Sequence, residues 1–84
     1  MEKLSDLPNI GKELEKQLQR ADIETVEQLR AVGSREAWLR IKAFDPSACY
    51  NRLCALEGAL RNVRWHNLPD DVKAELKEFY RQSK

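Results

Sequence analysis

The chain has 84 residues, 42% of them hydrophobic and 35% charged, and its 15 basic and 14 acidic side chains give a formal net charge of +1. A chain this short buries a modest fraction of its surface, so an interior cavity of substrate size is hard to support. The balanced charge gives the whole chain no net attraction for nucleic acid or for anionic lipid. We therefore expect one soluble domain over residues 1–84 that binds a partner and is not an enzyme.

The first part of the chain predicts a short helical turn and one amphipathic helix. The turn covers residues 3–7 and is stopped by Pro8, because proline lacks the amide hydrogen that a continuing helix needs. The helix covers residues 12–21, where apolar side chains recur three or four residues apart. Asp22 follows this pattern, and we expect the helix to end there.

Two further short helices are predicted on either side of Gly33. The first begins after Thr25, a good N-cap, and a glutamine three residues later can complete a capping box. Gly33 ends this helix, because glycine readily takes the left-handed conformation that follows many helix C-termini. Ser34 caps the next helix, which reaches about residue 44.

The longest predicted helix covers residues 46–63 and is expected to be the centre of the core. Asp45 and Pro46 mark its start, as an N-cap followed by proline at the first helical position. Gly58 costs this helix about 1 kcal/mol relative to alanine, and we expect the close approach of another helix to compensate. A last helix is predicted over residues 70–82. The apolar seam of the longest helix is expected to consist of Cys49, Leu53, Leu56, Leu60 and Val63.

These patterns predict an all-α fold, a compact bundle of five or six short helices. No stretch of the chain shows the sustained apolar alternation that is typical of a β-strand. The opening half of the bundle is expected to be helix-hairpin-helix/SAM-like.

The opening turn, Leu7-Pro8-Asn9-Ile10-Gly11, is the first candidate site. It resembles the turn of a helix-hairpin-helix motif, in which backbone amides at the start of the next helix donate to a phosphate. Basic side chains then recur every four residues and could follow a phosphate backbone. The alternative is a purely structural hairpin with a solvated lysine face. The candidate phosphate or DNA contacts are Asn9, Ile10, Gly11, Lys12 and Lys16.

The middle of the chain carries the second candidate site. Residues 35–64 hold six basic and three acidic side chains, so an anionic partner should prefer this segment. Aromatic residues and arginine are enriched where proteins contact each other. Alternatively, the arginines are scattered and solvated. The candidate partner surface consists of Arg40, Tyr50, Arg52, Arg61 and Arg64.

Glu57 lies in the most apolar predicted helix, where a buried carboxylate needs a hydrogen-bonding partner. We expect backbone amides, or the indole N–H of Trp38 or Trp65, to donate to it. A general base at this position would need a second catalytic group, and no such group has an interpretable spacing. Glu57, Gly58 and Trp65 are therefore assigned structural roles.

The two cysteines and the single histidine predict no metal site, no cofactor and no catalytic centre. Cys49 and Cys54 do not form a CxxC pair, and one histidine cannot complete a four-ligand zinc site with them. Five residues along a helix place the two thiols about 140° apart, so we expect two buried, reduced cysteines. The sequence has no signal peptide or long apolar run, which favours a cytoplasmic location without membrane contact.

The segment Asn51-Arg52-Leu53-Cys54-Ala55-Leu56-Glu57-Gly58-Ala59-Leu60 resembles the signature helix of the TfoX C-terminal domain. That helix commonly reads Asn-x-Leu-Tyr-Ala-Leu-Glu-Gly-Ala-Leu. Trp65 with Leu68-Pro69, and the opening turn with its asparagine, are similar to further elements of the family. The sequence departs from the family pattern at Asp22, where glycine is frequent, and at Cys54, where tyrosine is frequent.

The resemblance implies a regulatory, non-catalytic domain, because TfoX-type proteins are bacterial regulators of competence for DNA uptake. It covers nearly the whole chain, so we expect a standalone domain without the N-terminal α/β domain that such proteins usually carry. The expected mode of action is contact with an unidentified protein partner, or weak association of the chain with itself. The alternative is sequence-independent DNA binding through the helix-hairpin-helix-like turn.

Overall fold

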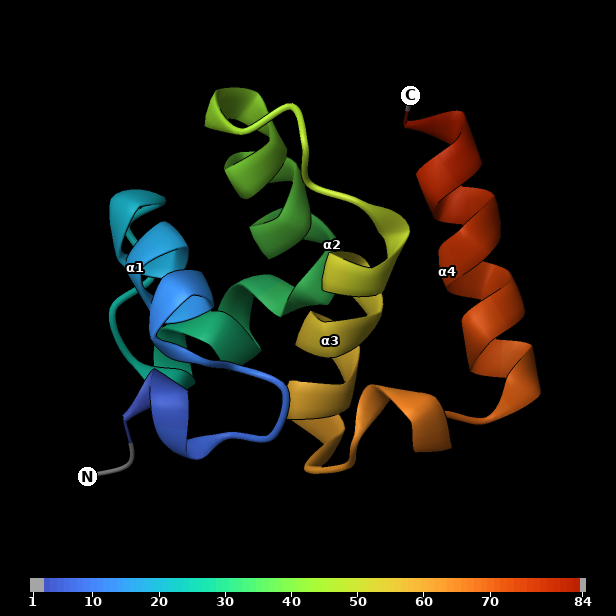
Figure 1. The fold of residues 1–84 in the computed structure, drawn as a ribbon, viewed down its shortest axis with the longest axis horizontal. Helices are drawn as coiled ribbons and strands as arrows, with labels where there is room; N and C mark the ends of the chain where they lie inside the picture. The colour runs from blue at the N-terminus through green and yellow to red at the C-terminus, as the bar shows by residue number, and fades with distance from the viewer. Residues whose placement is uncertain (1–2, 84) are drawn as a thin grey trace.

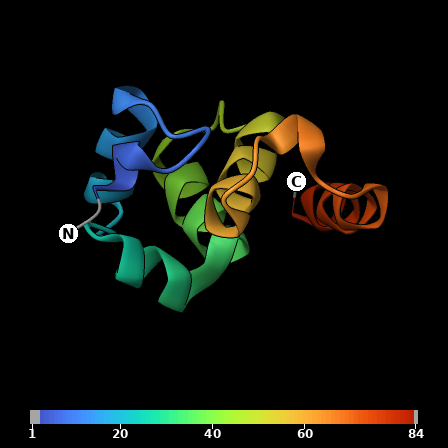
Figure 2. The same ribbon diagram turned by 90° about the horizontal axis from the view of Figure 1, so that it is seen from below.

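The computed structural model describes residues 3–83, and all the regular structure in that range is helical. The ends of the predicted domain 1–84, residues 1, 2 and 84, lie outside it. Helices α1 and α4 lie at opposite ends of the longest direction, with α2 and α3 between them (Figures 1 and 2). The elements in chain order are the 3-10 turn η1 (Leu4–Asp6), the helices α1 (Lys12–Arg20), α2 (Val26–Phe44) and α3 (Tyr50–Arg61), the 3-10 turn η2 (Trp65–Asn67) and the helix α4 (Asp70–Gln82).

Helix α3 is the centre of the core, as predicted. It packs against α2, α4 and η2, and the side chains of Leu53, Leu56 and Ala59 are completely buried. Leu60 and Val63 are partly buried and pack against the same core. Burial of one leucine side chain contributes about 1.5–3 kcal/mol, so this apolar seam is a main source of stability in so small a domain.

The predicted count of five or six helices is wrong, because the two helices expected around Gly33 follow each other without a loop. Gly33 has φ 83° and ψ 166°, which lie outside the helical region, and α2 continues on both sides of it. Glycine is needed at such a φ, because a side chain would strain the backbone. The predicted break is therefore a kink, and the described residues form four α-helices.

The loop between α1 and α2 confirms two of the predicted signals. Asp22 has a left-handed φ of 65° just after the end of α1. The Gln28 amide donates to Thr25 Oγ1 over 3.0 Å, and the Thr25 amide donates to Gln28 Oε1 over 3.3 Å. This pair of hydrogen bonds is the predicted capping box.

The prediction that a helix starts at Asp45 and Pro46 is wrong. One carboxylate oxygen of Asp45 accepts hydrogen bonds from both the amide and the hydroxyl of Ser47. The Ala48 amide donates to the main-chain oxygen of Asp45 over 3.0 Å. Together these bonds close a turn of the kind that aspartate favours, and the helix begins only at Tyr50.

Helix α3 is consequently shorter than the predicted helix over residues 46–63, and one cysteine changes its environment. Cys49 is the N-cap of α3 and is exposed, so the expectation that it is buried is wrong. Cys54, one helical turn further on, is completely buried, as expected. Both cysteines are free thiols.

Helix α4 is held against the rest of the molecule by apolar and aromatic side chains. Val72 and Leu76 are its buried residues. The ring of Trp38 on α2 lies 6.0 Å from the ring of Phe79 and 5.6 Å from that of Tyr80. Aromatic pairs in such tilted arrangements add about 0.5–1.5 kcal/mol beyond the area they bury.

Gly58 allows a close approach, although not the approach of another helix that was predicted. A Cβ atom at this position would lie 2.6 Å from Asn9 Nδ2, 2.8 Å from the main-chain oxygen of Val63 and 3.3 Å from Trp65 Cα. The neighbours are therefore one side chain and the backbone that follows α3. This backbone cannot move away without disturbing the end of the helix.

Gly58→Ala is expected to lower the free energy of unfolding by about 1–3 kcal/mol, the usual cost of extra volume at a packed site. The better helix propensity of alanine, worth about 1 kcal/mol, offsets part of the clash. Urea denaturation followed by circular dichroism measures the change. Gly11→Ala is the control, since a Cβ there meets nothing within 4 Å. An unchanged or raised stability of the Gly58 variant would contradict the close approach.

Candidate functional site

The side chain of Asn9, the first predicted phosphate contact, points into the molecule. Its Nδ2 donates to the main-chain oxygens of Ala55, at 3.3 Å, and Val63, at 3.0 Å. Its Oδ1 accepts from the amide of Trp65 over 3.2 Å. The left-handed φ of Asn9, 70°, is one that asparagine tolerates better than most residues. The asparagine therefore joins the opening turn to the end of α3.

The other members of the predicted phosphate set are divided between the interior and the surface. Ile10 is buried in the core. Gly11 is the N-cap of α1 and is exposed. Lys12 and Lys16 are exposed and form no ion pair with any residue in the range 3–83. The structure thus brings Gly11, Lys12 and Lys16 to the surface, whereas the side chains of Asn9 and Ile10 belong to the fold. The predicted phosphate contact at these two positions is through backbone amides, and the amide of Ile10 donates to the main-chain oxygen of Leu7 over 3.4 Å.

Three arginines of the predicted partner surface have separate carboxylate partners. Arg40 Nε lies 3.0 Å from Glu36, Arg52 Nη1 lies 2.9 Å from Asp45, and Arg61 Nε lies 2.5 Å from Glu57. These three contacts use all the acidic side chains of residues 35–64, so the positive excess of this segment rests on Arg35, Lys42 and Arg64.

The remaining two members of that surface have different neighbours again. The Tyr50 hydroxyl donates to the main-chain oxygen of Lys73 over 3.0 Å, and its ring lies 6.0 Å from that of Tyr80. Burial raises the pKa of Tyr50 to about 12. Arg64 is exposed and has no ion pair among the described residues. Tyr50 therefore joins the start of α3 to α4.

Glu57 accepts two hydrogen bonds, but from donors other than the predicted ones. The Ser34 hydroxyl donates to Oε1 and Arg61 Nε donates to Oε2, each over 2.5 Å. The indole of Trp38 donates instead to the main-chain oxygen of Cys49 over 3.2 Å. The predicted indole donor is therefore wrong for Trp38, because its N–H is bonded to a carbonyl oxygen instead.

The ionisation of Glu57 follows from these contacts. Burial of the carboxylate raises its pKa, but the hydrogen bonds from Ser34 and Arg61 outweigh that effect and bring the pKa below its ordinary value. Ser34 itself is almost completely buried, at 2% exposure. A hydrogen-bonded, ionised carboxylate of this kind fastens α3 to the kink of α2 and is unsuited to act as a base.

Asp45 forms a polar junction that the sequence did not reveal. Its carboxylate accepts from Ser47, from Arg52 and from Gln17 Nε2, the last over 2.7 Å. The hydrogen bond from the Ser47 hydroxyl, followed by that from Arg52, lowers the pKa of Asp45 to about 2. The sequence Asp45-Pro46-Ser47 is typical of such a turn, but it fits the predicted helix start equally well.

The remaining reactive side chains do not assemble into a centre. Burial raises the pKa of the Cys54 thiol. His66 is exposed and stacks on Trp65 with ring centroids 3.9 Å apart. Among residues 3–83, no three histidine, cysteine, aspartate or glutamate side chains are grouped as metal ligands would be. No helix in the same range combines the length and the apolar composition needed to cross a membrane.

Comparisons with known proteins give one family and several close relatives. Residues 1–80 match the family model described as the TfoX C-terminal domain. The chain is 35% identical over 78 residues to Protein Sxy of Escherichia coli (strain K12), a match that covers 93% of the chain and 37% of the relative. The chain thus spans little more than a third of that protein.

Two crystal forms from Listeria monocytogenes have the same fold. A triclinic form of an uncharacterized protein is 51% identical, with a TM-score of 0.95 over 96% of this chain and 92% of that one. A tetragonal form of a protein of unknown function is 50% identical, with a TM-score of 0.92 over 95% of this chain and 99% of that one. These similarities support the arrangement of helices described above.

Asn9→Gly separates a structural from a phosphate-binding role of the turn. Glycine accepts the same φ, so the loss of three side-chain hydrogen bonds should lower the free energy of unfolding by about 2 kcal/mol. Asn62→Gly is a matched control, because Asn62 also has a left-handed φ, 60°, and its side chain makes no hydrogen bond with the described residues. Chemical denaturation measures both. Equal stabilities of the two variants would refute the structural role.

The contribution of Glu57 to stability should depend on pH. Its pKa is lower in the folded protein than the ordinary 4.5, so the contribution is complete above that value and is lost as the pH falls through the folded pKa. Glu57→Gln should therefore cost about 1–2 kcal/mol near neutral pH and progressively less in acid. Thermal denaturation at a series of pH values tests this, with Glu27→Gln on the exposed surface as control. A penalty that stayed constant down to strongly acidic pH would contradict it.

Proposed function

The chain belongs to the TfoX C-terminal domain family, and from that premise we propose that it is a competence-regulator-like, non-catalytic module that acts by contact with a protein partner. TfoX-type proteins are regulators and not enzymes, which supports the non-catalytic role. Both cysteines are free thiols, which supports a location in the reducing cytoplasm.

The observation that carries this proposal is the internal pairing of the basic side chains. Arg40, Arg52 and Arg61 each contact a carboxylate of the same chain. Binding to a DNA backbone depends on cations that replace the counterions of several phosphates. Arginines that are already neutralised contribute little to such an exchange, so contact with a protein is favoured.

One observation favours DNA binding as the second candidate. Lys12, Lys16 and Arg20 recur along the exposed side of α1 without ion-pair partners among residues 3–83. These cations and the left-handed turn before α1 both support a helix-hairpin-helix/SAM-like opening half, which we propose together with this second candidate. The inward side chain of Asn9 and the acidic residues Glu13 and Glu15 in the first turn of α1 count against it.

A titration with a labelled DNA duplex at about 50 mM and about 200 mM salt separates the two candidates. A protein-docking module should show no saturable DNA binding at the higher salt concentration and no effect of Lys12→Glu. Affinity that falls steeply with salt and weakens in Lys12→Glu would overturn the proposal in favour of DNA. Sedimentation of the free chain over a range of concentrations shows whether the partner is a second copy.

A further inference from the structure

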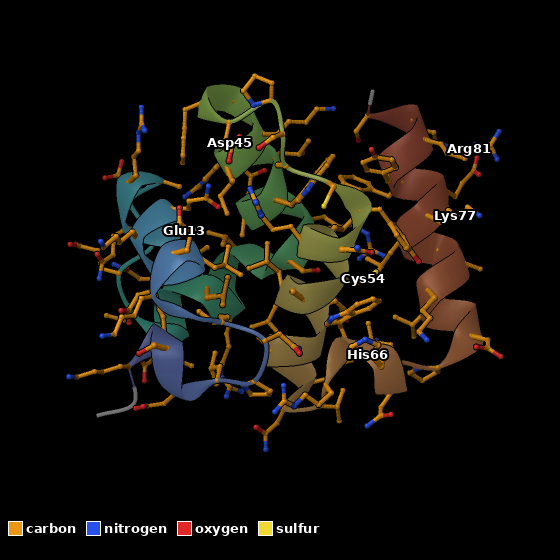
Figure 3. All side chains as sticks on the ribbon, in the orientation of Figure 1. Glu13, Asp45, Cys54, His66, Lys77 and Arg81 are labelled. Carbon is orange, nitrogen blue, oxygen red and sulfur yellow. The ribbon has the colours of Figure 1, made fainter. Side chains whose placement is uncertain are left out.

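Two hollows open on one face of the molecule, between α1 and the segment that joins α2 to α3. The first has a volume of about 290 Å³ and lies between Lys16 and Arg20 on α1 and Phe44 and Asp45 at the end of α2. Glu13 also lines it, and Figure 3 shows Glu13 and Asp45 on the same face of the molecule. This hollow is therefore bounded by charged side chains and one aromatic ring.

The second hollow, of about 360 Å³, lies beside the start of α3 and has a largely apolar lining. Leu14 on α1 forms one side, and Cys49 and Arg52 form the other. Glu13 and Gln17 line both hollows. The two hollows are therefore neighbours along α1, and we call them together the α1–α3 trough.

The charges along the trough leave a positive excess. Lys16 and Arg20 have no ion-pair partner among the described residues, whereas Arg52 and Asp45 already contact each other at 2.9 Å. The Arg20 guanidinium lies 4.4 Å from the centre of the Phe44 ring, a cation–π contact that holds it at the rim. Glu13 is the remaining unpaired acid of the lining. The lining therefore has two unpaired cations and one unpaired carboxylate, all three on α1.

The start of α3 adds partial positive charge at the second hollow. Its N-cap, Cys49, makes no capping hydrogen bond, and the first turn contains no acidic residue. The free amides at a helix N-terminus attract a carboxylate. Because Cys49 and Arg52 both line the second hollow, this end of α3 opens directly on the trough.

Between the two hollows, Gln17 has an acceptor without a donor. Its Nε2 donates to Asp45 over 2.7 Å, while its Oε1 is buried and accepts no hydrogen bond from the described residues. An unsatisfied buried acceptor costs about 1–3 kcal/mol. The amide of Gln17 therefore lies between the two hollows as part of the polar junction at Asp45.

We propose that the α1–α3 trough is the docking site for an acidic, amphipathic peptide segment of the protein partner, a proposal that rests on the proposed function. Apolar side chains of the segment lie against Leu14 and the ring of Phe44. Its carboxylates contact Lys16 and Arg20 and the N-terminus of α3. A basic segment would leave these cations unpaired and would meet like charge at the rim, so the charge of the trough selects the acidic partner.

The test uses a defined probe, a synthetic peptide of about 15 residues, long enough for about four helical turns. Its leucines recur three or four residues apart, and glutamates occupy the opposite face. One control peptide has glutamine in place of each glutamate, and another has serine in place of each leucine. Each is titrated into the isotopically labelled full chain, and amide chemical shifts report both the affinity and the location. We expect the acidic peptide to bind tightest and to shift the amides of the trough.

Paired charge reversals give matched variants. Lys16→Glu with Arg20→Glu should weaken binding of the acidic peptide at least about tenfold, equivalent to about 1.4 kcal/mol. Arg30→Glu with Lys77→Glu changes the net charge equally, at exposed residues that do not line the trough. Figure 3 shows Lys77 projecting outward from α4. This control pair should retain the affinity within about twofold, because long-range attraction is screened at physiological salt.

A third variant fills the second hollow without changing the charge. Cys49→Phe alters an exposed residue that makes no capping hydrogen bond, so the fold should persist, which the dispersion of the amide spectrum verifies. It should reduce binding of the acidic peptide, because the added ring occupies the space meant for an apolar side chain. Binding that is unchanged in both Cys49→Phe and the Lys16/Arg20 pair would overturn the trough as the site.

The outcomes also separate this inference from the proposed function. Absence of binding by the acidic peptide, equal binding by its glutamine analogue, or shifts confined to another face would each overturn the trough. Protein docking would still stand if the DNA titration showed no saturable binding at the higher salt concentration. A strong, salt-dependent DNA affinity that Lys12→Glu abolishes would instead overturn the proposed function.

Discussion

The fold depends on one long-range contact, in which the side chain of Asn9 reaches the backbone beyond the end of α3. Its partners Ala55, Val63 and Trp65 lie 46 to 56 positions further along the chain. Helical hydrogen bonds connect only neighbouring residues, so they cannot fix the opening turn relative to α3. A left-handed backbone at Asn9 directs the amide inward, and the missing side chain of Gly58 leaves the space that it occupies. This pair of residues therefore places η1, α1 and η2 around the central helix.

Several residues that resemble the family signature contribute to the architecture around this contact. Within that segment Leu53 and Leu56 form the buried seam, Glu57 is held by Ser34 and Arg61, and Gly58 makes room for Asn9. Each of these residues is thus already in contact with other parts of the same chain. A site for a partner molecule must therefore be sought on the surface that these contacts create.

Electrostatic pairing within the chain determines what that surface offers. Three arginines of the middle segment contact Glu36, Asp45 and Glu57, so the positive excess of that segment rests on Arg35, Lys42 and Arg64. The basic side chains of α1 form no ion pair with the described residues, and an acidic residue of the same helix has another partner. Glu15 accepts a hydrogen bond from the amide of Ser5 over 3.1 Å. Lys16 and Arg20 thus place unpaired positive charge at the rim of the α1–α3 trough.

The sequence by itself determined the helical class, the central helix and most of the helix boundaries, because apolar periodicity and capping residues such as Thr25 act over a few residues. It misplaced the start of α3, since Asp45 fits an N-cap and a turn equally well until its hydrogen-bond partners are known. The inward role of Asn9, the pairing of Ser34 with Glu57 and the shape of the trough were decided only by the tertiary structure. These features join residues far apart in the chain, and no local pattern records which side chains packing will bring together.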